Sequence, residues 1–317
     1  MAFTLADAKK LSDSKLTKYV IDEFRKSPLL DVMVFDDTVK PQGGSSLSYV
    51  YNRVTTLPTA AGRAINSEYV SQEAKTDRIT VDLKVFGGSF EIDRVLQNSE
   101  TEVVNHVNFQ LEQKIKATRA LFADWFINGD SAVDETAFEG LDKSLTGSST
   151  EKTLDTALDL SSAEMVEKNW KAFTYYLRQV MKLMDGAPTI MGVNSDMFAI
   201  FQSIADLSTQ YTQTKNELGT EIVKWGTATI MDLGDKPGTS KSIIETSSDD
   251  GTTDIYFARI GLDGVHGVTP TGSKEPSIYL PELKTPGAVK KGEVEMVAAT
   301  AIKASRAAAV LRKVKVV

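Results

Sequence analysis

A long amphipathic helix is the sequence feature that most limits what this 317-residue chain can fold into. Over residues 100–128, apolar or small side chains recur every three or four positions, which is the spacing of one helix face. These positions are Val104, Val107, Leu111, Ile115, Thr118, Phe122 and Trp125. At about 1.5 Å per residue the helix is roughly 40 Å long. We therefore predict a spine that crosses a flat molecule and is buried along one face over its whole length.

Composition excludes several kinds of protein. The chain has no cysteine, so it forms neither disulfides nor thiolate metal sites. No apolar run approaches ~20 residues, so we expect no transmembrane helix and no membrane partner. The charged N-terminus lacks the apolar core of a signal peptide, which favours synthesis in the cytoplasm.

The net charge of −7 predicts no bulk attraction to nucleic acid. The charge is uneven, because residues 296–317 contain five basic residues and no acidic one. The rest of the chain therefore carries −7 − 5 = −12. We expect the basic segment to pair with acidic side chains of its own lobe.

Two segments carry too little apolar surface to be stable alone. Residues 4–24 predict a helix with one apolar face, which ends at Ser27-Pro28. Residues 45–54 and 78–85 predict two strands joined by a weakly apolar excursion, an extended β-arm. The second strand alternates strictly, with one face formed by Ile79, Val81, Leu83 and Val85. An isolated strand pair is marginal in water, so we expect the arm to pack on another chain; the alternative is a mobile surface hairpin.

The remaining pattern predicts a mixed α+β chain. After the spine comes a loop with the tetrad Phe138-Glu139-Gly140-Leu141, and a helix begins at Ser161 or Ser162. A short buried strand at 190–193 is followed by a helix that Asn194 or Ser195 caps. Further strands are expected at residues 228–233, 241–245, 254–260, 293–302 and 307–317.

No catalytic or metal-binding constellation is visible in the sequence. His106 and His266 are isolated from each other and from ligand spacings. The acidic stretch at 249–254 lacks the spacing and distal Glu of a calcium loop, and residues 234–242 lack the spacing of a phosphate loop. The carboxylate pairs Asp36-Asp37 and Glu293/Glu295 are explained by solvated positions. We therefore predict no catalytic residue, no metal site, no cofactor and no enzymatic activity.

The order of these segments resembles the major capsid proteins of tailed bacteriophages, the Hong Kong 97 type of shell protein, whose fold encapsulins share. The resemblance covers nearly the whole chain and is carried by the opening helix, Ser27-Pro28-Leu29-Leu30, the extended arm, the spine, and Asn128-Gly129-Asp130 followed by the tetrad. It implies an N-terminal arm at 1–44, an extended loop at 45–85, a peripheral lobe at 86–188 with the spine at 100–128, an axial lobe at 189–286, and returning peripheral strands at 287–317.

The resemblance also implies a function. We expect self-assembly into the hexamers and pentamers of an icosahedral head, with flexible joints such as Gly87-Gly88 beside the arm. The head encloses double-stranded DNA without sequence-specific binding, and the basic segment at 296–317 could then moderate the repulsion of this DNA instead of pairing within its lobe. The chain shows no long charged scaffold region, so we expect a separate scaffolding protein, besides a portal and a decoration protein. Some relatives cross-link subunits through lysine; Lys75 and Lys84 lie near the arm, but nothing in the sequence establishes such a bond. Two alternatives stay open: an encapsulin-like compartment and a soluble α+β enzyme that uses carboxylates.

Overall fold

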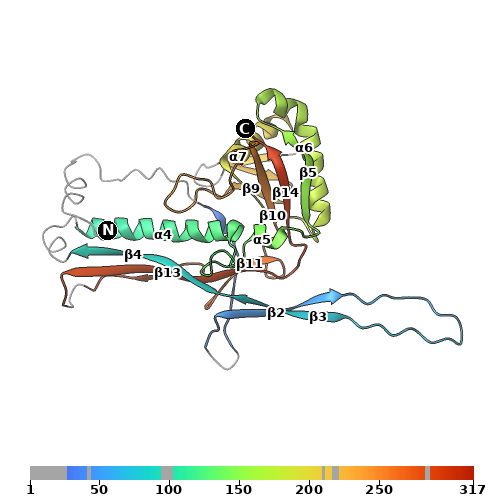
Figure 1. The fold of residues 1–317 in the computed structure, drawn as a ribbon, viewed down its shortest axis with the longest axis horizontal. Helices are drawn as coiled ribbons and strands as arrows, with labels where there is room; N and C mark the ends of the chain where they lie inside the picture. Colours follow the sequence, from blue (N-terminus) through green and yellow to red (C-terminus); the bar gives the residue numbers. More distant parts are fainter. Residues whose placement is uncertain (1–26, 41–43, 94–102, 209–210, 216–220, 283–285) are drawn as a thin grey trace.

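The computed structural model describes residues 27–40, 44–93, 103–208, 211–215, 221–282 and 286–317 (Figure 1). The helix predicted over residues 4–24 lies outside this set. The described chain is mixed α+β, as predicted, and it builds two lobes and a projecting hairpin (Figure 1).

The first lobe is a sheet with the spine helix on it. Helix α4, Val103–Asn128, is continuous and packs on strands β4, Lys84–Asp93, and β13, Val289–Ile302 (Figure 1). The strand order is β1-β11-β13-β12, and β4 also pairs with β13. The three shorter strands are β1, Phe35–Asp37, β11, Val265–Thr269, and β12, Ser277–Tyr279. A short helix, α2, Leu29–Val32, also contacts α4.

The spine is one helix, as predicted, but its burial is uneven. Phe122, Phe126 and Ile127 are almost completely buried, because the C-terminal half of α4 lies in the main core. Leu111 and Ile115 in the N-terminal half stay partly exposed in the lone chain. The prediction of a face buried along the whole length is therefore wrong for one subunit.

The second lobe is a seven-stranded sheet covered by two helices. Its strand order is β5-β14-β10-β6-β9-β8-β7, with β5 parallel to β14 and β6 parallel to β9. The strands are β5, Glu151–Asp159, β6, Ile190–Val193, β7, Tyr211–Lys215, β8, Glu221–Trp225, β9, Ala228–Asp232, β10, Thr252–Ala258, and β14, Ala308–Lys315.

The two helices of this lobe begin where the sequence predicts. In α6, Ala163–Leu183, the Ser162 hydroxyl accepts a hydrogen bond from the Met165 N–H at 3.3 Å. In α7, Ser195–Leu207, the Asn194 side chain accepts one from the Met197 N–H at 2.9 Å. These caps satisfy N–H groups that have no partner within the helix. The apolar faces of both helices join one core with the sheet.

Several segments belong to a different sheet from the one expected. β11 and β12, from the 189–286 range, pair with β13 in the spine lobe. β5 and α6, from the 86–188 range, and β14, from the returning strands, lie in the seven-stranded lobe. The expected domain boundaries are wrong at these points, because alternation along a strand defines its buried face and not its neighbour in the sheet.

Two strand predictions also change. Residues 241–245 form no strand and make only one bridge, between Ser242 and Asp235. The strand expected over 78–85 divides at Leu83, which is buried, whereas Val85 is 54% exposed and Phe86 is buried. Alternation fails there because the chain leaves the hairpin and begins to pair with β13 as β4.

Candidate assembly site: the projecting hairpin and its root

The hairpin of β2, Ser48–Thr56, and β3, Lys75–Asp82, extends away from both lobes (Figure 1). The two strands pair only with each other in the described structure, and residues 57–74 connect them at the tip. Here we call residues 57–74 the tip and Tyr49, Tyr51 and Arg53 the root residues.

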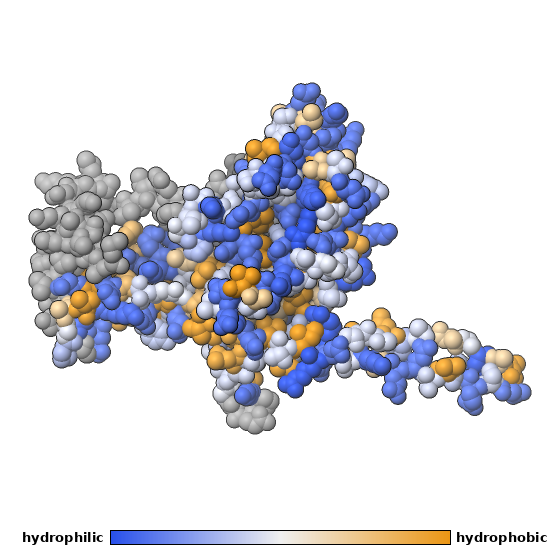
Figure 2. All heavy atoms as spheres, in the orientation of Figure 1, coloured by the Kyte–Doolittle hydropathy of each residue, from blue (hydrophilic) through white to orange (hydrophobic). Residues whose placement is uncertain are grey.

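The tip presents large apolar side chains to solvent. Ile65 is 91% exposed and Val70 is 86% exposed, and Leu57 and Tyr69 are also mostly exposed. Figure 2 shows apolar side chains scattered among hydrophilic ones along this arm. A single subunit offers these four side chains no cover, so their apolar surface is left in water unless another chain packs on it.

The root is held firmly, in contrast to the tip. The Tyr51 hydroxyl donates to the Ile302 carbonyl at 2.7 Å, and Arg53 Nε donates to the Lys303 carbonyl at 2.9 Å. Arg53 Nη2 donates to the same Ile302 carbonyl at 2.5 Å. These bonds join the hairpin to the end of β13, so the direction of the arm is set by the spine lobe.

Tyr49 completes the root through a polar contact with β1. Its hydroxyl donates to Asp36 at 2.5 Å, and the Lys303 ammonium lies 5.2 Å from the centre of its ring. Burial acts to raise the pKa of Asp36, but the Tyr49 hydrogen bond and the Lys303 charge, 3.5 Å away, hold it below its ordinary value. Burial and the bond to Asp36 raise the pKa of Tyr49. Asp36 therefore holds the root in place, and the expectation that a solvated position explains this carboxylate is wrong.

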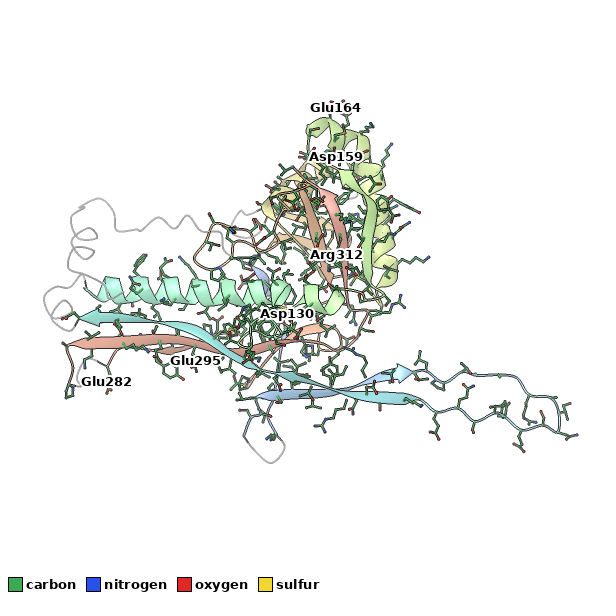
Figure 3. The ribbon with its side chains drawn as sticks, in the orientation of Figure 1. Asp130, Asp159, Glu164, Glu282, Glu295 and Arg312 are labelled. Atoms are coloured by element: carbon green, nitrogen blue, oxygen red, sulfur yellow. The ribbon has the colours of Figure 1, made fainter. Side chains whose placement is uncertain are left out.

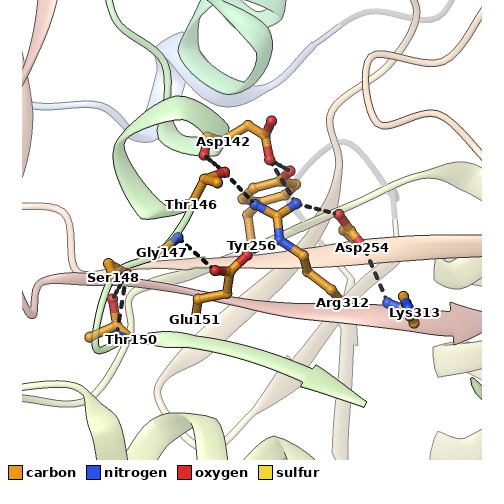
Figure 4. Close-up of polar contacts among 10 residues, drawn as sticks. All are labelled: Asp142, Thr146, Gly147, Ser148, Thr150, Glu151, Asp254, Tyr256, Arg312 and Lys313. Atoms are coloured by element: carbon orange, nitrogen blue, oxygen red, sulfur yellow. Dashed lines mark hydrogen bonds and ion pairs between the residues drawn. The ribbon is translucent and has the colours of Figure 1, made fainter. Parts of the chain in front are cut away.

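A second polar cluster joins the tetrad loop to the seven-stranded lobe (Figure 4). Arg312 on β14 makes ion pairs with Asp142 at 2.7 Å, with Asp254 at 2.8 Å, and with Glu151. The Tyr256 hydroxyl donates to Asp142 at 2.9 Å. Burial raises the pKa of Asp254, and Arg312 opposes that rise. Asp142 lies on helix α5, Leu141–Leu145, so one guanidinium fixes this helix to three strands.

The tetrad itself closes the end of the spine. Phe138 packs against Phe122 and Trp125, with ring centres 5.5 and 5.7 Å apart. The Gly140 N–H donates to the Gly129 carbonyl at 2.7 Å. The backbones approach so closely here that the loop has room for glycine but not for a side chain. Figure 3 shows neighbouring Asp130 at this end of α4 and Arg312 in the lobe beside it.

The other residues considered from the sequence do not converge on a site. Lys84 donates to the Glu135 carbonyl at 2.6 Å, and Glu293 pairs with Lys291 on β13. Gly87 is a ladder residue of β4 and not a joint: a Cβ there would lie 2.0 Å from the Val294 carbonyl oxygen. Glycine is needed at this position for close approach of the two strands.

Metal and membrane signals are absent from the described part of the chain. No group of three or more His, Asp or Glu side chains in it is placed to hold a metal ion. Among these same residues, no helix combines the length and the apolar character needed to cross a bilayer.

The root is the feature that sequence reasoning missed, whereas the pairing of the basic C-terminal segment with acidic side chains of its own lobe was expected and is seen where Arg312 pairs with Glu151 and Asp254. The alternation Tyr49-Val50-Tyr51-Asn52-Arg53 does place the three root residues on one face of the strand, and it could have identified them. The identity of the acidic partners carries no comparable signal, because Asp142 lies 170 positions before Arg312 in the sequence.

The chain is similar in structure to known shell proteins. No protein-family model and no curated protein matches it in sequence. The holo-SrpI encapsulin complex from Synechococcus elongatus superimposes with a TM-score of 0.67 at 13% identity, covering 100% of this chain and 97% of that one.

Two capsids match over nearly as much of the chain. The capsid of the native GTA particle gives a TM-score of 0.63 at 12% identity over 98% of this chain and 97% of that one. The capsid of Myoviridae phage XM1 gives 0.63 at 10% identity over 96% and 98%. The chain therefore has the Hong Kong 97-type fold that its segment order predicts.

Proposed function

We propose that this chain is the major capsid protein of a tailed-bacteriophage type of head, whose copies form the hexamers and pentamers of an icosahedral shell. The observation that carries this proposal is the hairpin, which is anchored at its root and exposes an apolar tip that one subunit cannot cover. The whole-chain similarity to capsid structures supports it. The tip then contacts a neighbouring copy, and the shell rather than the subunit is the stable unit.

The two lobes take different places in such a ring. The seven-stranded lobe is the axial lobe, near the centre of each hexamer or pentamer, and the spine lobe is the peripheral one. Double-stranded DNA is enclosed by confinement and without sequence-specific contacts, which an acidic subunit permits. A separate scaffolding protein, a portal and a decoration protein are the further partners, and the virion is the final location after synthesis in the host cytoplasm.

A second candidate is an encapsulin-like compartment, which the whole-chain match to the SrpI encapsulin favours. The contents of particles purified from their native source separate the two. A phage head contains nuclease-protected double-stranded DNA, whereas a compartment of this kind contains a cargo protein. Both candidates are structural roles without catalysis. A compact monomer with enzymatic activity would instead support the third alternative, a soluble α+β enzyme that uses carboxylates.

The test compares two double variants of the full chain. Ile65→Ser with Val70→Ser removes apolar surface from the tip, and Val133→Ser with Leu262→Ser removes exposed apolar surface from the body. We expect shells, by sedimentation and electron microscopy, from the wild type and the body variant, and folded, unassembled subunits from the tip variant. A compact monomeric wild type, or a tip variant with a normal yield of shells, would contradict the proposal.

A further inference from the structure

The buried side chain of His266 lies directly beneath the hairpin root. It is 0% exposed, and neither of its ring nitrogens makes a well-formed hydrogen bond within the described structure. His266 lies on β11 opposite Ala301 of β13, and the Tyr49 ring meets the imidazole edge-on with centres 5.7 Å apart. The Tyr49 ring is therefore part of the cover that keeps this imidazole from solvent.

The groups around the imidazole oppose one another. The Lys303 ammonium disfavours a second positive charge, whereas Asp36 and the backbone of Gly261 and Gly264 favour it. Strand β2 contributes Tyr49 and Arg53. The Tyr49 hydroxyl donates to Asp36, and the Arg53 guanidinium donates to the backbone at the end of β13. Burial is the largest effect, and with Lys303 it lowers the pKa of His266.

We propose that His266 makes the attachment of the hairpin root sensitive to pH: the root stays docked over the neutral imidazole and loosens when the imidazole is protonated. A charged imidazole in this position is both desolvated and close to Lys303. When Tyr49 moves aside, water solvates the imidazolium and screens its repulsion from Lys303. This pH dependence acts on the attachment of the arm within one subunit, so it does not depend on whether shells form.

The direction follows from proton linkage. In the docked state the pKa is lowered, and in the released state His266 has its ordinary value of about 6.5. The released state therefore binds protons more readily at mildly acidic pH. The stabilisation of docking by the neutral imidazole is complete above about pH 6.5 and is lost as the pH falls below it. Between pH 7.5 and 5.5 the ratio of released to docked root should rise by up to about tenfold.

Hydrogen exchange of the full-length subunit measures this ratio. Peptides covering β2 are followed at pH 7.5 and 5.5, corrected for intrinsic exchange and referred to peptides of β6 in the other lobe. We expect protection of β2 to fall up to about tenfold in the wild type and in His106→Gln, which removes the other histidine. His266→Gln, and His266→Phe if the first variant does not fold, should make the protection of β2 independent of pH over this range.

Titration of the two imidazoles by NMR, assigned with His106→Gln, provides a check that needs no His266 variant. The proposal is overturned if His266 titrates at or above 6.5 in the docked subunit. It is equally overturned if β2 keeps its protection at pH 5.5, or if His266→Gln retains the pH dependence.

Discussion

At the scale of single residues, Gly140 shows how closely the tetrad loop approaches the end of the spine. Its backbone is extended, with φ of −89° and ψ of 174°, so its conformation suits any residue. The space does not, because a Cβ there would lie 2.5 Å from the Ile127 carbonyl oxygen and 2.7 Å from the Gly129 nitrogen. Both contacts are with backbone atoms, which cannot move aside as a flexible side chain would.

We therefore predict that Gly140→Ala lowers the free energy of unfolding of the unassembled subunit by about 1–3 kcal/mol, the usual cost of overpacking. Urea unfolding measures the change in the free energy of unfolding. Gly62→Ala is the matched control, because nothing lies within 4 Å of a Cβ at Gly62, and it should change stability by less than about 0.5 kcal/mol. Equal effects of the two substitutions would mean that the loop relaxes freely.

Arg312 is the second residue with a sharp prediction. Its side chain is 18% exposed, and Arg312→Met leaves the neighbouring carboxylates of Glu151 and Asp254 without their cation. Loss of one partner of a fully buried pair costs about 3–5 kcal/mol; because this cluster is partly solvated, we expect about 1–3 kcal/mol at pH 7.

The destabilisation should shrink as the pH falls towards 4. Without Arg312 the pKa of Asp254, already raised by burial, rises further in the folded state. The penalty is then complete above that folded-state pKa and disappears as both states become protonated. Unfolding in urea at pH 7 and 4.5 measures it, with Arg312→Lys as the charge-retaining control; a penalty that is the same at both pH values would contradict this account.

At the scale of elements, the pattern of the sequence predicted individual segments better than their partners. α4 was found because an apolar stripe is a local signal, and α6 and α7 were found because such a stripe follows a capping residue. β5 was missed because the sequence of Glu151–Asp159 has few β-branched or aromatic residues, and β11 was missed because it contains Gly267 within a glycine-rich stretch. Sheet membership was not predictable, because β14 alternates in the same way whichever sheet it joins.

β14 gives the element-scale prediction, because it is an interior strand between β5 and β10. Val310, Leu311, Val314 and Val316 are buried, and at about 1.5–3 kcal/mol each they contribute about 6–12 kcal/mol. That is comparable with the whole stability of a domain. Removal of residues 308–317 should therefore leave the seven-stranded lobe unfolded by circular dichroism and sensitive to protease. Removal of Val317 alone, which is 67% exposed, should not.

At the scale of the whole molecule, the segment before residue 27 has an apolar face in sequence and lies outside the described structure. We predict that deletion of residues 1–26 leaves the thermal unfolding of the body unchanged and reduces shell yield in sedimentation. In the full-length chain, Leu11→Ser with Leu16→Ser should reproduce the loss, and Lys10→Ser with Lys15→Ser should not. Normal shells from the deletion would show that this segment is dispensable.

The separation of paired segments along the chain has a consequence for how the protein folds. The two strands of the hairpin are close in sequence, because residues 57–74 connect them. By contrast, the hydrogen bond from Tyr51 to Ile302 spans 251 positions, and β5 pairs with β14 near the end of the chain. High contact order slows folding. A growing chain on the ribosome therefore carries its arm long before the body that anchors it, and the open edges of β4 and β5 are exposed to aggregation until their late partners emerge.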